Sequence, residues 1–226
     1  MRTGGAGGRK PRGEPGKGGL RGREAEADAQ GPGVEARIAA GVLLNAALER
    51  RGGMDEVMGK PEVAALSGPD RAFARAVALA ALRRLGEIDA ILDRRLAKRP
   101  SPAVLTILRL AVAQLLVLET PAFAVVSTAV RQAERDGATR QYKGLVNAVL
   151  RGIGRDGFGP TDPVTNLPDW LAARWLATYG EAALAGLAEA TRHEPPTDLS
   201  PRDPSDAEAL AATVEGDVLP GGSHPA

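Results

Sequence analysis

Apolar residues recur at helical spacing through most of the middle of the chain. In residues 34–50 and 73–85 they return every three or four positions, which is the period of one face of an α-helix. Residues 104–118 are apolar nearly all round, so we expect this segment to be the central, buried helix. Two further helical patterns follow at 125–133 and 143–153. The pattern predicts an all-α fold, an antiparallel helical bundle with short connections.

Polar residues stand where several of these helices should begin. Ser67 can accept hydrogen bonds from free amides of a first turn, where Pro69 is tolerated and Asp70 complements the helix dipole. By the same reasoning Thr139 is predicted to cap the last helix of the bundle. Asn166 is predicted to cap a new helix that follows a linker rich in Gly, Pro and Asp, and Gly180 is predicted to separate this helix from a second one at 183–190.

Composition divides the chain into four parts. These are a disordered, basic, Gly-rich tail (1–33), a helical domain (34–156), a short helical linker (157–196) and an incomplete α+β start (197–226). The tail has almost no large apolar side chain whose burial could offset its ordering entropy. In the last part, residues 197–199 and 217–219 are predicted to be short strands on either side of a helix. Such a unit needs more sheet to pair with.

The overall composition limits the kinds of fold and of functional site that this chain can contain. Hydrophobic residues make up 43% of the chain and aromatic residues only 3%, which favours packed helices. The absence of cysteine excludes disulfides, thiolate metal ligands and cysteine nucleophiles, and it fits a cytoplasmic location. No apolar run approaches the ~20 residues of a membrane span. Neither His193 nor His224 has further ligands at metal-binding spacing. We therefore expect no catalytic, metal or cofactor site in this chain.

The net charge of +1 hides a strong asymmetry along the chain. Residues 34–156 carry nineteen Lys and Arg against thirteen acidic residues, whereas residues 157–226 carry three against eleven. Arginine can hold a phosphate by two parallel hydrogen bonds, so the basic domain is a candidate for binding nucleic acid. Ordinary surface ion pairs are the competing explanation. The scarcity of aromatic residues argues against stacking on single-stranded bases, which leaves recognition of backbone and shape.

Several segments resemble the NusB-like domain. The sequence GPDRAFARAVALAALRRLGEIDAILDRRL (68–96) resembles its paired-Arg element, and LTILRLAVAQLLVLETPAFAVVSTAV (105–130) resembles its central helix and the helix after it. KGLVNAVLRGI (143–153) is similar to its closing motif, although Leu145 stands where Phe is common. The segment 167–203 is similar to the linker of RsmB-type (Sun/Fmu family) 16S ribosomal RNA cytosine-C5 methyltransferases.

This resemblance implies a NusB-like helical bundle that binds structured ribosomal RNA. In the methyltransferase family a later domain binds S-adenosylmethionine and uses cysteines in catalysis. This chain has neither its Pro-Cys motif nor its Gly-rich loop, so the resemblance implies a non-catalytic part truncated before that domain. The residues predicted to contact RNA are Arg37, Arg71, Arg75, Arg83, Arg84, Arg140, Lys143 and Arg151.

Two other functions stay open from the sequence. One is a stand-alone transcription antitermination factor that acts with a protein partner on the helical bundle. The other is a protein-binding helical scaffold with no RNA role. The tail after residue 156 argues against the first, because an antitermination factor does not need it.

Overall fold

The computed structural model describes residues 33–49 and 53–219, and every regular element within them is helical. The α-helices are α2 (Val34–Leu48), α3 (Pro61–Ala64), α4 (Gly68–Arg83), α5 (Leu85–Asp93), α6 (Pro102–Leu116), α7 (Ala122–Arg135), α8 (Lys143–Asp156), α9 (Asp169–Thr191) and α10 (Ala207–Val214). Single 3₁₀ turns are η1 (Met54–Val57), η2 (Arg140–Tyr142), η3 (Pro163–Asn166) and η4 (Pro204–Asp206). The predicted all-α fold is confirmed. The basic tail 1–32 lies outside the described residues.

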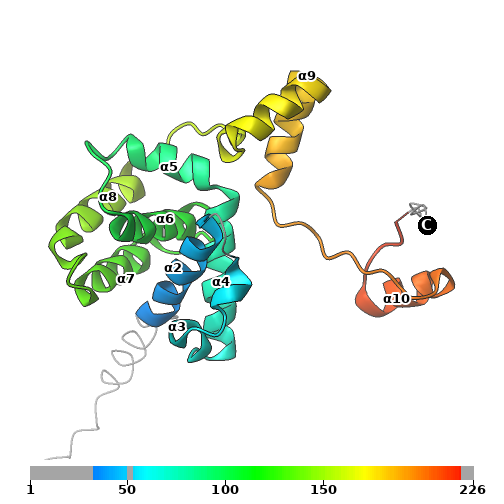
Figure 1. The fold of residues 1–226 in the computed structure, drawn as a ribbon, viewed down its shortest axis with the longest axis horizontal. Coiled ribbons are helices and arrows are strands. Elements are labelled where there is room, and N and C mark those ends of the chain that lie inside the picture. The colour runs from blue at the N-terminus through cyan, green and yellow to red at the C-terminus, as the bar shows by residue number, and fades with distance from the viewer. Residues whose placement is uncertain (1–32, 50–52, 220–226) are drawn as a thin grey trace, which may run out of the picture. The chain divides into compact units, whose positions relative to one another are not determined.

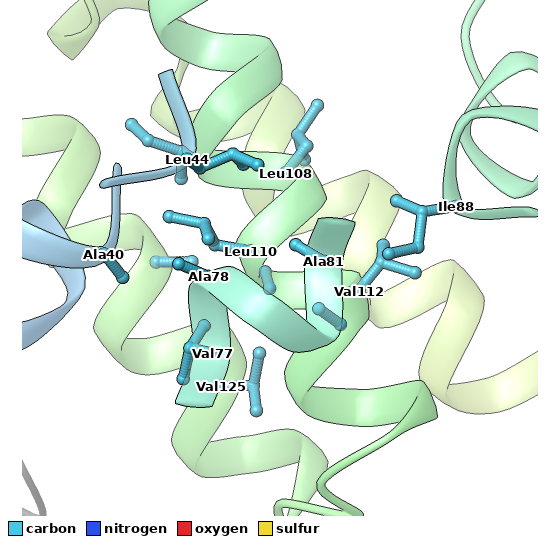
Figure 2. Close-up of a cluster of buried hydrophobic side chains, with 14 of the residues drawn as sticks. Ala40, Leu44, Val77, Ala78, Ala81, Ile88, Leu108, Leu110, Val112 and Val125 are labelled. Atoms are coloured by element: carbon cyan, nitrogen blue, oxygen red, sulfur yellow. The ribbon is translucent and has the colours of Figure 1, made fainter. Parts of the chain in front are cut away.

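Helix α6 is the centre of the bundle, as its apolar sequence predicts. It packs against α2, α4, α5, α7 and α8, which surround it in Figure 1. Figure 2 shows three core side chains of α6, which are Leu108, Leu110 and Val112. The other labelled side chains of this core come from α2, α4, α5 and α7. Because α6 is buried on almost all sides, its position fixes where the outer helices present their exposed faces.

One of the three predicted helix caps is present. The Ser67 hydroxyl accepts a hydrogen bond from the backbone N–H of Asp70 at 3.2 Å. Thr139 does not cap a helix, because its hydroxyl donates to the carbonyl of Ala133 at 2.8 Å and α8 begins only after η2. The prediction for Asn166 is also wrong, since α9 begins three residues later and this side chain binds α5 instead.

The segment after α8 packs closely against α5. A side-chain carbon added at Gly86 would lie 1.7 Å from the carbonyl oxygen of Thr165, so only glycine permits this approach of η3 to α5. Helix α9 is interrupted at Gly180, where φ is 80°, as the sequence predicts. Its two halves bury a small second core around Leu184 and Ala188.

The described chain forms two compact units, which divide between Arg192 and His193. In the second unit α10 forms where the sequence predicts a helix. The two predicted strands, 197–199 and 217–219, do not form, and both segments are extended without ladder hydrogen bonds. A strand is stable only beside another strand, and the described part of this unit offers none. In the described ranges, no helix is both long enough and apolar enough to cross a membrane.

Candidate functional site

Arg37 lies inside the bundle and not on its surface. The residue is 5% exposed, and its Nε donates a hydrogen bond to the Oε1 of Gln114 at 2.8 Å. Its guanidinium lies 5.0 Å from the ring centre of Phe73. Burial lowers the pKa of Arg37 to about 10, and the positive charge of Arg131 acts in the same direction. The structure therefore places Arg37 among the residues that hold α2, α4 and α6 together, out of reach of RNA.

The arginines of α4 and its C-terminus are partly used in internal contacts. Arg71 donates from Nη2 to the backbone carbonyls of Leu66 and Ala64, at 3.0 and 3.4 Å. Arg84 makes a two-point contact with the Glu87 carboxylate, at 2.9 and 3.2 Å. Arg83 is half-buried and Arg75 is exposed. Of the four, Arg75 is the best placed to meet an external ligand.

Glu87 is the centre of a buried ionic cluster, which we call the Glu87 cluster (Arg84, Glu87, Asn166 and Arg192). Its carboxylate is fully buried, accepts from Asn166 Nδ2 at 2.8 Å and lies 3.2 Å from Arg192 Nε. The Asn166 carbonyl accepts from the backbone N–H of Glu87 at 3.0 Å. Burial raises the pKa of Glu87, but hydrogen bonds, first from Arg84 and then from Asn166, outweigh it and lower the pKa to about 2. The cluster attaches the segment after α8 to α5.

The other three predicted residues lie on α8 or just before it. Lys143 Nζ lies 2.9 Å from Glu134 Oε1, and Arg140 Nε donates to the Glu134 backbone carbonyl at 3.0 Å. Arg151 is exposed two helical turns further along α8. Between residues 122 and 157 there are six basic and three acidic residues. The structure thus brings Arg140, Lys143 and Arg151 together and separates them from the arginines of α4.

A groove of about 560 Å³ runs between α7 and α8 beside these residues. Its apolar floor includes Val126 and Val130, and polar side chains on its walls come from Ser127, Asn147 and the arginines at 131 and 151. At one end a side-chain carbon on Gly154 would lie 3.3 Å from Ala122 Cβ, which shows how closely the helices approach there. We call the basic surface of this pair the α7–α8 face; it comprises Arg131, Arg140, Lys143, Asn147 and Arg151.

The predicted contact residues did not include Arg131 or Asn147 of this surface, or Phe123 of the groove beside it. Arg131 lines the groove, and its Nε is buried without a hydrogen-bond acceptor in the described part of the chain. Phe123 stands at the rim of the groove with 73% of its surface exposed. The signal was available in the spacing, because 123, 127 and 131 are four residues apart on one face of α7, as 143, 147 and 151 are on α8.

The fold and this surface define a helical bundle with one basic, grooved face. The chain belongs to the NusB family, because that family matches residues 34–155, more than half of the chain. The matched region begins with α2 and ends with α8, so it contains the whole bundle around α6.

Two curated relatives carry the name Ribosomal RNA small subunit methyltransferase B. The protein of Xanthomonas campestris pv. campestris is 34% identical over 177 residues, which cover 75% of this chain and 39% of that protein. The protein of Xylella fastidiosa is 35% identical over 119 residues, which cover 51% of this chain and 27% of that protein. The resemblance stated from the motifs is confirmed. The chain spans less than half the length of these relatives.

Proposed function

We propose that this bundle binds folded ribosomal RNA through the α7–α8 face and takes no part in chemical catalysis itself. The observation that carries the proposal is the grouping of Arg131, Arg140, Lys143 and Arg151 on one helix pair beside a groove. The name of the two relatives, a ribosomal RNA methyltransferase, supports RNA as the ligand. The α4 arginines contribute less, because two of them are occupied by protein acceptors.

Binding on this face works through the phosphate backbone. Each Lys or Arg that meets a phosphate releases condensed counterions, so affinity falls steeply as salt increases. Arg151 is exposed and makes no ion pair within the described residues, so it keeps its full donor set for a phosphate. Lys143 exchanges its exposed ion pair with Glu134 for a contact with RNA at little cost, and Arg140 exchanges its exposed hydrogen bond to the Glu134 carbonyl.

The methyl transfer named in the relatives belongs, in this proposal, to protein outside this chain. S-adenosylmethionine would supply the methyl group there. The described residues form no Gly-rich turn between a strand and a helix, which is the usual cradle for such a cofactor. We therefore assign this chain the role of holding and orienting the RNA.

The extent of the similarity favours this role over that of a stand-alone antitermination factor. Three quarters of a 226-residue chain is about 170 residues, whereas the NusB match covers only 34–155. Even if the 33 residues before that match were included, residues 1–155 would be too few. The similarity to the methyltransferase must therefore continue past residue 155. The Glu87 cluster then joins this later segment to the bundle.

The experiment measures affinity for structured small-subunit ribosomal RNA fragments across a salt series. We expect Arg140→Ala, Lys143→Ala and Arg151→Ala in one protein to weaken binding and lower the salt slope by about 2–3. A control protein loses three exposed basic residues elsewhere, through Lys60→Ala, Lys98→Ala and Arg202→Ala. If the two triple variants bind equally well, the α7–α8 face is not the site. If the unaltered protein shows no salt-sensitive binding, RNA is not the ligand.

A further inference from the structure

The groove between α7 and α8 combines features that backbone recognition does not need. Phe123 is 73% exposed at its rim, while the chain's two other phenylalanines, Phe73 and Phe158, are half-buried. An exposed aromatic ring beside a groove offers a flat apolar surface on which a ligand can stack. Its neighbours in the groove are the aliphatic side chains of Ala122, Val126 and Val130, together with one hydroxyl, one amide and two guanidinium groups. This arrangement suits a ligand with one flat apolar part and one anionic part.

The positions along the groove are ordered. Phe123 lies at the end where Gly154 lets α7 and α8 approach, and Arg131 lies two turns away, about 12 Å along the helix axis. On the opposite wall Arg151 and Asn147 follow Gly154 in the same direction, since α7 and α8 are joined by a short turn and run antiparallel. A ligand in the groove therefore meets the ring first, then Arg151, then Asn147 and Arg131.

Two observations point to a negatively charged occupant. The Nε of Arg131 is buried and has no acceptor among the described residues, although buried donors are nearly always hydrogen-bonded. The charge of Arg131 also helps to lower the pKa of the neighbouring Arg37. A phosphate oxygen beside the Arg131 guanidinium would place negative charge next to this buried donor and offset the repulsion.

We propose that this groove captures one unpaired nucleotide of the bound RNA, an inference that rests on the proposed function. The base stacks on Phe123, its phosphate is held by Arg151 and Arg131, and the Asn147 amide hydrogen-bonds to the base edge or the ribose. An unpaired base leaves a helix at less cost than a paired one, because no base pair has to be broken, so the face would prefer RNA with a bulge or loop to a continuous duplex. This sharpens the expectation from composition, which assigned recognition to backbone and shape alone.

Continuity with the rest of the face favours RNA over an acidic peptide. Asn147 and Arg151 share one side of α8 with Lys143, so the groove opens onto the residues proposed to hold the backbone. A strand that places a nucleotide in the groove can pass its neighbouring phosphates over Lys143 and Arg140. A short peptide would use the groove and leave these two cations with only their exposed contacts to Glu134.

The test compares two RNA duplexes that differ only in one unpaired 2-aminopurine. We expect the unaltered protein to bind the bulged duplex about 5- to 20-fold more tightly, with quenching of the 2-aminopurine fluorescence as the base stacks. Phe123→Ala should remove both the preference and the quenching and leave affinity for the paired duplex unchanged. Phe123→Trp should retain both. Because Phe123 is exposed, helical content should be the same in all three proteins.

Tyr179→Ala is the matched control, since Tyr179 is also an exposed aromatic residue, at 60%, on another helix. It should keep the preference for the bulge. Equal affinity of the unaltered protein for both RNAs would overturn the inference alone, as would a preference that survives Phe123→Ala or disappears in Tyr179→Ala. The absence of salt-sensitive binding to either RNA would instead overturn the proposed function as well.

Discussion

The bundle uses arginine in opposite ways on two of its sides. Around α4 and α5, arginines bind protein acceptors: Arg71 holds backbone carbonyls and Arg84 holds the buried Glu87 carboxylate. Along α7 and α8, Arg140 and Lys143 make only exposed contacts with Glu134, and Arg151 lies open beside a groove. Both regions are rich in basic residues in the sequence. What distinguishes them is that the first region contains a fully buried carboxylate, whereas the described residues of the second contain none.

The number of basic residues in a region therefore does not show whether that region can bind an external ligand. A buried carboxylate such as Glu87 commits its arginine partners to the fold, because removing either side would leave a charge without compensation. An exposed glutamate such as Glu134 does not fix its basic partners in place, since exposed ion pairs form and break at almost no cost. The proposed binding face is therefore the region in which cations have exposed partners or none within the described chain.

Loss of the Glu87 carboxylate is the largest effect we predict. Glu87→Ala should lower the free energy of unfolding by about 3–5 kcal/mol, because Arg84 and Arg192 remain partly buried without their anion. Urea unfolding followed by circular dichroism measures this change. Affinity for RNA at low temperature, where the variant is still folded, should not change. A stable variant with weakened RNA binding would reverse the assignment of the two sides.

The same carboxylate should make stability depend on acid pH. The pKa of Glu87 is lowered from 4.5 to about 2, so its ionic contacts stabilise the folded state fully above pH 4.5. That stabilisation should be lost progressively as pH falls from about 4.5 towards 2. The difference in unfolding free energy between the unaltered protein and Glu87→Gln should therefore shrink over this range. A difference that stays constant between pH 5 and pH 2.5 would contradict the pairing.

Two single arginine substitutions compare the regions directly. Arg84→Ala should destabilise the fold by about 2 kcal/mol and leave RNA affinity unchanged, since its partner is buried. Arg151→Ala should change stability by less than about 0.5 kcal/mol and weaken RNA binding several-fold. Thermal unfolding and fluorescence anisotropy with the same RNA measure both effects. The same outcome for both variants would remove the distinction between the sides.

Arg37 gives the smallest effect. Arg37→Met keeps an unbranched side chain of similar reach but loses the hydrogen bond to Gln114 and the contact with the Phe73 ring. We expect a loss of about 1 kcal/mol in unfolding free energy, with RNA affinity unaltered. A fall in RNA affinity without a loss of stability would show instead that Arg37 contacts RNA.

Much of the bundle could be predicted from the sequence because its helices obey local rules. The all-round apolar segment became the central helix α6, the Ser67 cap formed, and Gly180 broke α9. These features depend on periodicity, capping and backbone freedom, all of which act within a few residues. The family resemblance drew on the same segments, since the quoted motifs all lie in or between these helices.

Contacts between distant segments could not be predicted in this way. Asn166 has the composition of a helix cap, yet its side chain binds Glu87, 79 residues away. Arg37 and Arg151 are both basic helix residues, but only the fold puts one inside and the other on the groove. Residues 197–199 have a strand-like sequence but no neighbouring strand in the described part of the chain. In each case the outcome depends on which segment packs opposite, and a single sequence does not specify that.

The most direct test of RNA binding at the α7–α8 face is hydrogen–deuterium exchange. It is measured with and without a structured small-subunit ribosomal RNA fragment, and it observes the α4–α5 side and the α7–α8 side in one experiment. The proposed function predicts slower exchange in peptides from residues 122–156 on addition of RNA. Peptides from residues 68–93, which contain α4 and α5, should exchange at the same rate in both states. Protection confined to α4 and α5, with no change across α7 and α8, would contradict the claim.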